Sequence, residues 1–337
     1  MAKDTTTLTI DQARRLTARA LTKSGAKRGN IKYLLDAIIE TERQGLSSHG
    51  LFWVPIYCEH LKCGKLDGQA KPEITRLSPV SYRADAKSGF AHPAIDKGFA
   101  KIIPAAKRSG IAAIAVTNSY NCGTLGIHTA RLAEAGLIGW GFTNAPASIA
   151  PTGGKTPVVG TNPVSMAVPD GNGNARFVID QSSSVIAKSE VMRHKTEGKP
   201  IPLGWALDAD GNPTDDPVEG LKGSMAPSGG QKGFGQGLMV EIMAAAASGA
   251  MLGSQCSSFA TNDGGPCNTG QFFIAIDPQG FSGGLFGTRV DDLCAAITGQ
   301  DGARLPGSNR AAQRTRIDAE GIALKKDLLK RIRGHCK

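Results

Sequence analysis

The sequence predicts an α+β fold, in which a sheet domain is inserted into a helical domain that both ends of the chain build together. Three observations carry this prediction. Apolar residues recur at helical spacing near both ends, short apolar runs typical of buried strands occupy the middle, and two of these runs flank a turn. We therefore assign residues 1–115 and 285–337 to the helical domain, and residues 116–284 to the sheet domain.

The N-terminal part, up to about residue 110, reads as helices joined by short glycine or proline turns, with an edge strand at residues 7–10. Its clearest helix begins after the expected N-cap Asn30 and stops at Gly45. The apolar stripe of this helix consists of Ile31, Leu34, Leu35, Ile38 and Ile39. Such a stripe predicts a helix with one buried face.

A tight turn with the sequence Ser-Ser-His-Gly follows at residues 47–50. Either serine can cap the next helix, whose apolar positions repeat from residue 51 to a stop at Gly64. His49 would then lie at the mouth of that helix, where an imidazole can meet solvent and substrate. The alternative is a capping turn in which His49 is only a surface side chain.

The middle of the chain changes to strand patterns. Residues 111–116 and 137–142 read as buried strands around a short helix at 126–134, which together would make one βαβ unit. Residues 164–168 and 176–180 then flank a turn rich in Asp, Asn and Gly, which is typical of a hairpin. Antiparallel pairing is therefore expected in the sheet.

The last third returns to helices. An apolar helix is expected at residues 234–252, after the glycine-dense segment 228–233. Residues 271–276 read as one more buried strand, and the chain closes with helices near 289–298 and 318–333. These terminal helices complete the predicted helical domain.

The composition is that of a globular protein. Of the 337 residues, 40% are hydrophobic and 20% charged, and no stretch approaches the ~18 apolar residues that a membrane span needs. The polar start of the chain shows no signal-peptide pattern, so we expect a cytoplasmic protein without a membrane partner. The seven cysteines form no C-x-x-C pair, and the six histidines show no metal-ligand spacing, so we expect reduced thiols and no metal.

The net charge of +10 admits either an anionic small ligand or a nucleic acid as partner. Much of the positive charge lies in the terminal helices, interleaved with leucine and alanine, and aromatic residues make up 5%. The sequence therefore shows no cluster of aromatic residues on which the bases of a single-stranded nucleic acid could stack. We expect solvated helix faces, a small-molecule substrate and no nucleic-acid partner.

Two segments resemble phosphate-binding motifs but do not match them. Residues 233–237 read G-x-G-x-G without a clean preceding strand, so the dinucleotide fingerprint does not fit. Residues 154–156 resemble the end of a P-loop, but Ile149 occupies the position of its first glycine. What remains is Lys232 at the start of a helix, where amide groups and the ammonium can hold a phosphate. The alternative is a flexible connector.

A polar loop at residues 180–184 leaves the end of a predicted strand. Its hydroxyl and N–H groups could bind a ligand, and Asp180 is a candidate to orient a histidine. The alternative is a helix-capping run in which Ser184 precedes Val185.

Together, six short motifs resemble the type-2 malate/L-lactate dehydrogenase family. They are Ser48-His49-Gly50 with Pro55, Asn118-Ser119 with Gly123, Gly160-Thr161-Asn162-Pro163, Asp180 with the serine run, Gly230-x-Lys232-Gly233, and Arg304-Leu305-Pro306-Gly307. They occur in order over nearly the whole chain. The family includes ureidoglycolate, sulfolactate and diketogulonate enzymes, and reductases of Δ1-piperideine-2-carboxylate and Δ1-pyrroline-2-carboxylate.

The resemblance implies a homodimer that binds its nicotinamide cofactor on a non-Rossmann, largely antiparallel sheet domain, in agreement with the failed fingerprint. The family's catalytic histidine falls on His49, with Ser48 and Asp180 as relay partners, and a substrate-contacting threonine falls on Thr161. The cofactor contacts implied are Asn121, Cys122, Gly123, Thr124, Leu125, Asp180, Gln181, Ser182, Ser183, Ser184, Gln231, Lys232, Gly307, Ser308 and Asn309.

Three departures from the family pattern concern the pocket. Many members carry an arginine four residues after the histidine, suited to a substrate carboxylate, and this chain has Trp53. Asn121-Cys122-Gly123 replaces a common His-Phe-Gly, and Gly307-Ser308-Asn309 replaces Gly-Glu-Arg. A flat indole favours a ring or an apolar surface, so we read Trp53 as a wall for a cyclic substrate.

The leading hypothesis is an NAD(P)H-dependent oxidoreductase that reduces a cyclic imino acid, Δ1-pyrroline-2-carboxylate or Δ1-piperideine-2-carboxylate, to the L-amino acid. His49 would donate the proton; a helix N-terminus should lower its pKa, and Asp180 should raise it. The basic residues Lys188, Arg193 and Lys195 favour NADPH over NADH. The alternatives are a 2-hydroxy acid dehydrogenase of the malate or lactate type, and a non-catalytic binding protein on the same fold.

Overall fold

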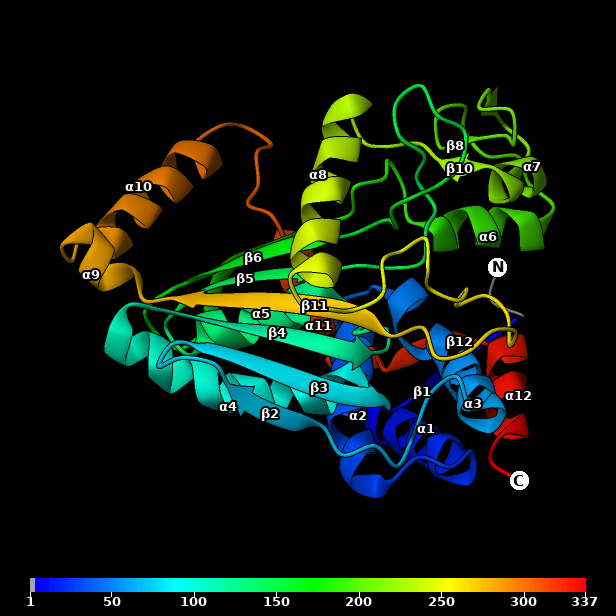
Figure 1. The fold of residues 1–337 in the computed structure, drawn as a ribbon, viewed down its shortest axis with the longest axis horizontal. Helices are drawn as coiled ribbons and strands as arrows, with labels where there is room; N and C mark the ends of the chain where they lie inside the picture. The colour runs from blue at the N-terminus through cyan, green and yellow to red at the C-terminus, as the bar shows by residue number, and fades with distance from the viewer. Residues whose placement is uncertain (1–3) are drawn as a thin grey trace.

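The computed structural model describes residues 4–337, and its two ends lie together in one helical cluster (Figure 1). Strand β1 pairs antiparallel with β12, which joins the two ends directly. The elements of this cluster are β1 (Thr5–Leu8), α1 (Ile10–Lys23), α2 (Arg28–Arg43), α3 (Val54–Cys63), α11 (Ser308–Glu320), β12 (Ile322–Lys325) and α12 (Lys326–Gly334). Its core holds Leu21, Leu34 and Leu51 from the first part of the chain and Ile332 from the last.

A seven-stranded sheet forms the body of the molecule. In spatial order its strands are β2 (Glu73–Arg76), β3 (Ser81–Gly89), β4 (Ile111–Ser119), β11 (Thr269–Ile276), β5 (Ile138–Thr143), β6 (Val164–Pro169) and β7 (Ala175–Gln181). Among the strands of this sheet within residues 4–337, only β3 and β4 pair in parallel. The predicted antiparallel character is therefore confirmed, and β6 and β7 form the predicted hairpin.

Helices cover both faces of this sheet (Figure 1). Helices α4 (Ala91–Ser109) and α5 (Leu125–Glu134) pack on one face, where Phe99 and Phe273 meet edge to face with ring centroids 5.1 Å apart. Helix α8 (Gln231–Glu241) and the π-helical turn Ile242–Ala246 contact β11 and β5. Apolar burial on both faces fixes the sheet between its helices.

The remaining elements lie outside the sheet. They are α6 (Lys188–Glu197), β8 (Ala206–Leu207), β9 (Pro213–Thr214), α7 (Pro217–Lys222), β10 (Ser224–Met225), α9 (Pro278–Ser282) and α10 (Phe286–Thr298). The three short strands form a small sheet of their own, and α9 and α10 project from the end of β11 (Figure 1). Within residues 4–337, no helix combines the length and apolar character needed to cross a membrane.

One sequence-based expectation about strands is confirmed in part, and another is wrong. Strands β4 and β5 run parallel in one sheet and α5 connects them, as in the expected βαβ unit, but β11 lies between them and pairs antiparallel with both. The first 110 residues are not all helical, because β2 and β3 belong to the large sheet. The proposed domain boundary between residues 115 and 116 falls inside β4.

Two expectations about helices are also wrong. The helix expected at residues 318–333 is interrupted by Gly321, which has a φ of 87°, and by strand β12, where Ile322 and Leu324 face inward. Helix α2 begins before Asn30, whose side chain donates hydrogen bonds to the carbonyls of Gly68 and Ala70 instead of capping the helix. At both positions, long-range contacts and not the local sequence pattern determine the structure.

Candidate active site

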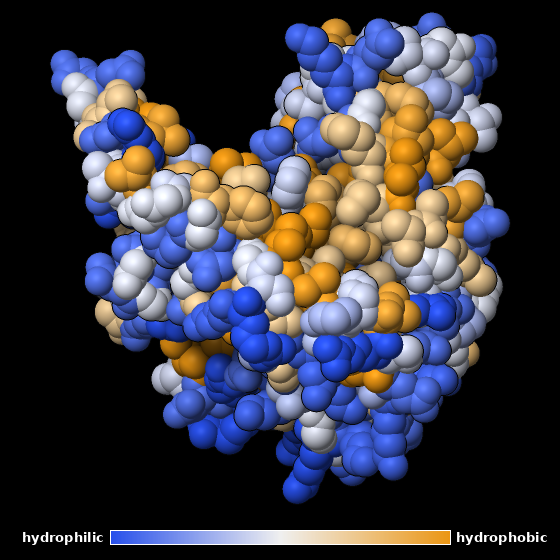
Figure 2. All heavy atoms as spheres, turned by 60° about the vertical axis from the view of Figure 1, so that its left-hand side comes forward, coloured by the Kyte–Doolittle hydropathy of each residue, from blue (hydrophilic) through white to orange (hydrophobic). Residues whose placement is uncertain are grey.

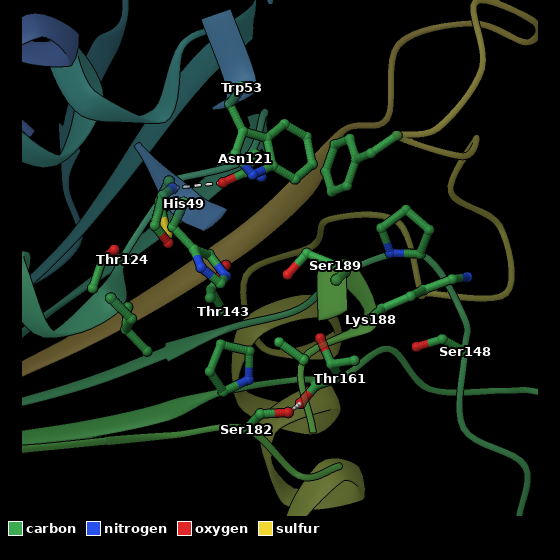
Figure 3. Close-up of a pocket in the computed structure, with 18 of the residues that line it drawn as sticks. His49, Trp53, Asn121, Thr124, Thr143, Ser148, Thr161, Ser182, Lys188 and Ser189 are labelled. Carbon is green, nitrogen blue, oxygen red and sulfur yellow. Dashed lines mark hydrogen bonds between the residues drawn. The ribbon is translucent and has the colours of Figure 1, made fainter. Parts of the chain in front are cut away.

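A cavity of about 330 Å³ lies where the helical cluster meets the sheet, and many residues singled out from the sequence line it (Figure 3). The turn before α3, the β4–α5 connection, the ends of β5 and β7, helix α6 and the irregular segment before β11 all contribute. Its lining includes His49, Trp53, Asn121, Cys122, Gly123, Thr124, Leu125, Thr161, Asp180, Ser182, Lys188, Ser189, Phe259, Ala260 and Arg310.

His49 ends a short 3-10 turn, Ser47–His49, and its Nδ1 lies 3.0 Å from the hydroxyl oxygen of Ser48. The expected serine cap is wrong: α3 begins only at Val54 and has no side-chain cap. His49 therefore does not lie at the mouth of α3. The pKa of His49 is lowered by burial, and the carboxylate of Glu190 opposes this shift.

Glu42 on α2 supports the turn that carries His49. Its carboxylate accepts a hydrogen bond of 2.6 Å from the N–H of Leu51, and a Cβ at Gly50 would overlap that carboxylate. The indole N–H of Trp53 donates to the carbonyl of Ser48 at 3.1 Å. Burial raises the pKa of Glu42 to about 7, so the turn rests on an acid that titrates near neutral pH.

Asp180 lines the same cavity but makes a different contact from the one expected. Its carboxylate accepts a hydrogen bond of 2.7 Å from the N–H of Gly126 at the start of α5. Burial raises the pKa of Asp180, and the backbone hydrogen bond and the charge of Arg310 oppose the rise. The carboxylate that raises the pKa of His49 is Glu190 on α6, so the effect expected from Asp180 is not found.

The segment 121–125 lines the cavity throughout, as expected for a cofactor-binding turn. The side-chain oxygen of Asn121 accepts from the N–H of Gly123 at 2.5 Å, and Gly123 has a φ of 70°. Nε2–H of the buried His128 donates to the carbonyl of Cys122 at 2.8 Å. The turn is therefore fixed before any ligand arrives.

The serine run divides between the cavity and the interior. Ser182 lines the cavity, and its hydroxyl donates to the carbonyl of Thr161 at 3.1 Å. Ser183 and Ser184 are buried, with hydroxyls that donate to the carbonyls of Asn162 and Ile186. Gln181 is exposed. Only Ser182 of this run therefore offers its hydroxyl to a ligand in the cavity.

Thr161 is held in the cavity by the residue that follows it. Asn162, with a φ of 35°, donates to the buried carboxylate of Glu241 at 2.6 Å, and its side-chain oxygen accepts from the N–H of Ala145. The same carboxylate accepts from the N–H of Gly253 at 2.6 Å. This network joins α8 to the loops on which Thr161 lies.

The remaining expected cofactor residues lie outside this cavity. Gly307, Ser308 and Asn309 line a second hollow of about 410 Å³, which shares Leu46 and Arg310 with the first. Gln231 and Lys232 are exposed at the start of α8 and line neither. Within residues 4–337, no group of three or more His, Cys, Asp or Glu side chains could hold a metal ion.

Comparison with known proteins identifies the family of this chain. The family model for malate/L-lactate dehydrogenase matches residues 8–333. The chain belongs to the malate/L-lactate dehydrogenase family. The family and the oxidoreductase class expected from the sequence are thereby confirmed.

Relatives in this family have several names. A (2R)-3-sulfolactate dehydrogenase (NADP(+)) of Chromohalobacter salexigens is 39% identical over 97% of each chain. A Δ1-pyrroline-2-carboxylate reductase of Ancylobacter novellus is 36% identical over 94% of each. The crystal structure of Δ1-piperideine-2-carboxylate reductase from Pseudomonas syringae matches with a TM-score of 0.91 at 31% identity, covering 98% of this chain and 99% of that one.

The structure of this family member adds residues that sequence reasoning missed. Lys188 and Ser189 of α6 line the cavity, and Glu190 of the same helix acts on His49. From the sequence, Lys188 is expected only as a basic residue that favours NADPH, and its place in the cavity wall is not predicted. Phe259 lies in a segment with no periodic pattern, and the sequence offers no signal for it.

Proposed function

We propose that the chain is an NADPH-dependent reductase of cyclic imino acids, acting on Δ1-pyrroline-2-carboxylate or Δ1-piperideine-2-carboxylate and producing the L-amino acid. The observation that carries this proposal is a single cavity in which His49 lies beside an aromatic wall. Trp53 and Phe259 form this wall, edge to face with ring centroids 6.0 Å apart. The names of the relatives support the same substrate class.

The cofactor would lie across both hollows, along the sheet domain. The turn 121–125, Asp180 and Ser182 would hold its nicotinamide end. The second hollow suits the phosphates, because Arg304 and Arg310 line it and helix α11 starts there without a side-chain cap. When bound, the cofactor supplies the hydride. Lys232, which lines neither hollow, stays a proposed phosphate contact.

His49 is the residue proposed to move a proton. Its Nδ1 is occupied by Ser48, which leaves Nε2 to donate a proton to the substrate nitrogen, or to a keto oxygen. Burial lowers the pKa of this imidazole, and the charge of Glu190 opposes the shift. Ser48 is its positioning residue through the Nδ1 contact, Glu190 acts through its charge, and Asp180 stays a proposed relay partner.

The substrate carboxylate needs a cation, because Trp53 stands where many relatives have arginine. Lys188 supplies one: it lines the cavity, burial lowers the pKa of its ammonium, and a substrate carboxylate beside it would offset that shift. Thr161 lines the cavity too and adds a hydroxyl. Figure 3 shows Lys188, Ser189, Thr161 and Ser182 in the part of the cavity away from Trp53.

The substrate class is tested by following NADPH and NADH oxidation at 340 nm with both cyclic imines, pyruvate and oxaloacetate. We expect kcat/KM for the better imine to exceed that for the keto acids by at least about tenfold, with NADPH preferred. Faster turnover of the keto acids would favour the alternative function, a 2-hydroxy acid dehydrogenase. The name of the 39% identical sulfolactate dehydrogenase supports this alternative.

We also propose a cytoplasmic homodimer. Apolar side chains gather in a hollow on the face shown in Figure 2. The exposed apolar residues on α8 and the segment after it are Leu238, Met239, Ile242, Met251 and Leu252, and those on α9 and α10 are Phe281, Leu285 and Leu293. Exposed apolar surface of this kind marks an interface. Light scattering should give about twice the 35.1 kDa of one chain, and a monomer would contradict the proposal.

A further inference from the structure

The segment between the π-helical turn and β11 forms part of the cavity wall although it has no regular structure. Residues 247–268 contain no helix or strand, and Ser258, Phe259 and Ala260 from this segment line the cavity. A long irregular segment would ordinarily move on its own. Something must hold it if it is to shape a substrate site.

Lys65 is the residue that holds it. This lysine follows the left-handed C-cap Gly64 of α3, and only 1% of its surface is exposed. Its ammonium donates to three main-chain carbonyls of the segment, those of Ser258 at 2.7 Å, Thr261 at 2.9 Å and Asp263 at 2.8 Å. The three N–H donors of the ammonium are thus all used by one stretch of backbone.

A buried ammonium without a carboxylate is costly unless dipoles replace its water. Within residues 4–337 no ion pair involves Lys65, so the three carbonyl dipoles alone compensate its charge. They do so only while the segment keeps this path. The contact therefore fixes the segment to the end of α3, the helix that follows Trp53.

A second residue also holds this segment. Nε2–H of the buried His60, also on α3, donates to the carbonyl of Thr261 at 3.1 Å, and its Nδ1 hydrogen-bonds the hydroxyl of Tyr120. Burial and the charge of Lys65 lower the pKa of His60, which keeps the imidazole neutral and suits these two roles. Tyr120 in turn packs edge to face against Phe259, with ring centroids 5.0 Å apart.

Because both anchors lie on or directly after α3, Phe259 is held in fixed register with Trp53, on which it packs, and with His49 four residues before Trp53. We propose that Lys65 is a positioning residue that fixes Phe259 against Trp53, and that Phe259 is a specificity residue that favours cyclic over open-chain substrates. This inference rests on the proposed function for its substrate class. The placement of Phe259 by Lys65 does not depend on it.

The test uses the full chain, four variants and one control variant. Lys65→Met keeps the length of the side chain and removes its donors, Lys65→Arg keeps the charge with another geometry, and Phe259→Ala removes the ring. The double variant Lys65→Met/Phe259→Ala completes a cycle. Lys97→Met is the control, because Lys97 also donates to a main-chain carbonyl, that of Pro72 at 3.0 Å, but Pro72 lies outside the segment 247–268 and does not line the cavity.

In steady-state assays, Lys65→Met and Phe259→Ala should each raise KM for the cyclic imine about tenfold and leave kcat within about twofold. KM for pyruvate should change little, and the double variant should be no worse than Phe259→Ala alone. Lys97→Met should keep the wild-type ratio. Equal losses on both substrates, or additive losses in the double variant, would overturn the specificity role.

A second measurement needs no substrate. In a background where Phe replaces Trp140 and Trp205, Trp53 is the remaining tryptophan, and its emission should shift to the red in Phe259→Ala and in either Lys65 variant. Lys65→Arg serves here if Lys65→Met does not fold. An unshifted Trp53 emission would refute the placement of Phe259 by Lys65. If the wild type reduces no imine while the shift is present, the proposed function fails and the positioning role stands.

Discussion

Replacing Glu42 by glutamine tests the electrostatics of the turn that carries His49. Glu42 is 4% exposed, and its raised pKa means that its carboxylate is disfavoured in the folded chain. A rise from 4.5 to about 7 corresponds to about 3 kcal/mol in favour of the protonated form. The folded chain therefore holds a proton that the unfolded chain has lost between these pH values.

The sign of the pH dependence follows from this difference. Because the folded pKa is raised, the stability from this group is fully present below about pH 4.5 and is lost as pH rises through about 7. Glutamine has the same shape, still accepts the Leu51 N–H and carries no charge. Glu42→Gln should therefore lie within about 1 kcal/mol of the wild type near pH 5 and exceed its free energy of unfolding by about 3 kcal/mol near pH 8.

Urea unfolding at pH 5 and pH 8 measures this difference. The control is Glu320→Gln, because Glu320 is an exposed residue on α11 and its replacement should leave the pH dependence unchanged. If Glu42→Gln and the wild type lose the same stability between the two pH values, the reasoning about this buried carboxylate is refuted.

Three further predictions concern the cavity. His49→Ala should lower kcat by roughly 10²–10⁴-fold with nearly unchanged cofactor affinity, and near wild-type turnover would exclude it as the proton donor. Glu190→Gln should move the limb of the pH–rate profile that reports His49 to lower pH, because it removes the charge that raises the pKa of His49. Asp180→Asn should leave this limb in place. If instead Asp180→Asn moves the limb and Glu190→Gln does not, Asp180 is the relay partner. Lys188→Met should raise KM for the imine about tenfold or more and leave the cofactor Kd unchanged in a fluorescence titration, whereas equal changes would assign Lys188 to the cofactor.

The parts of the fold that local patterns determine could be predicted from the sequence. The hairpin of β6 and β7 has its turn residues in place, and α2 has a complete apolar stripe. Strand β3 was missed because its buried positions are Tyr82, Ala84 and Ala86, and alanine carries little strand signal. The position of β11 between β4 and β5 depends on long-range pairing, which no local pattern records.

The candidate site also contains residues that sequence motifs predict and residues that only the fold brings together. The motifs that carry the family resemblance led to His49, the turn 121–125 and Thr161, and the structure places all of these around one cavity. Glu190 and Phe259 could not be found this way. Glu190 acts on His49 because α6 forms part of the cavity wall, and the segment that carries Phe259 is held by long-range contacts from Lys65 and His60.

The product of the reaction tests the central claim most directly. The purified protein is incubated with Δ1-pyrroline-2-carboxylate and NADPH, and proline is quantified by chiral chromatography beside the NADPH consumed. The account predicts L-proline, one molecule for each NADPH oxidised, and no such product from His49→Ala in the same time. Absence of proline, together with NADPH-dependent reduction of an open-chain 2-keto acid to its hydroxy acid, would contradict it.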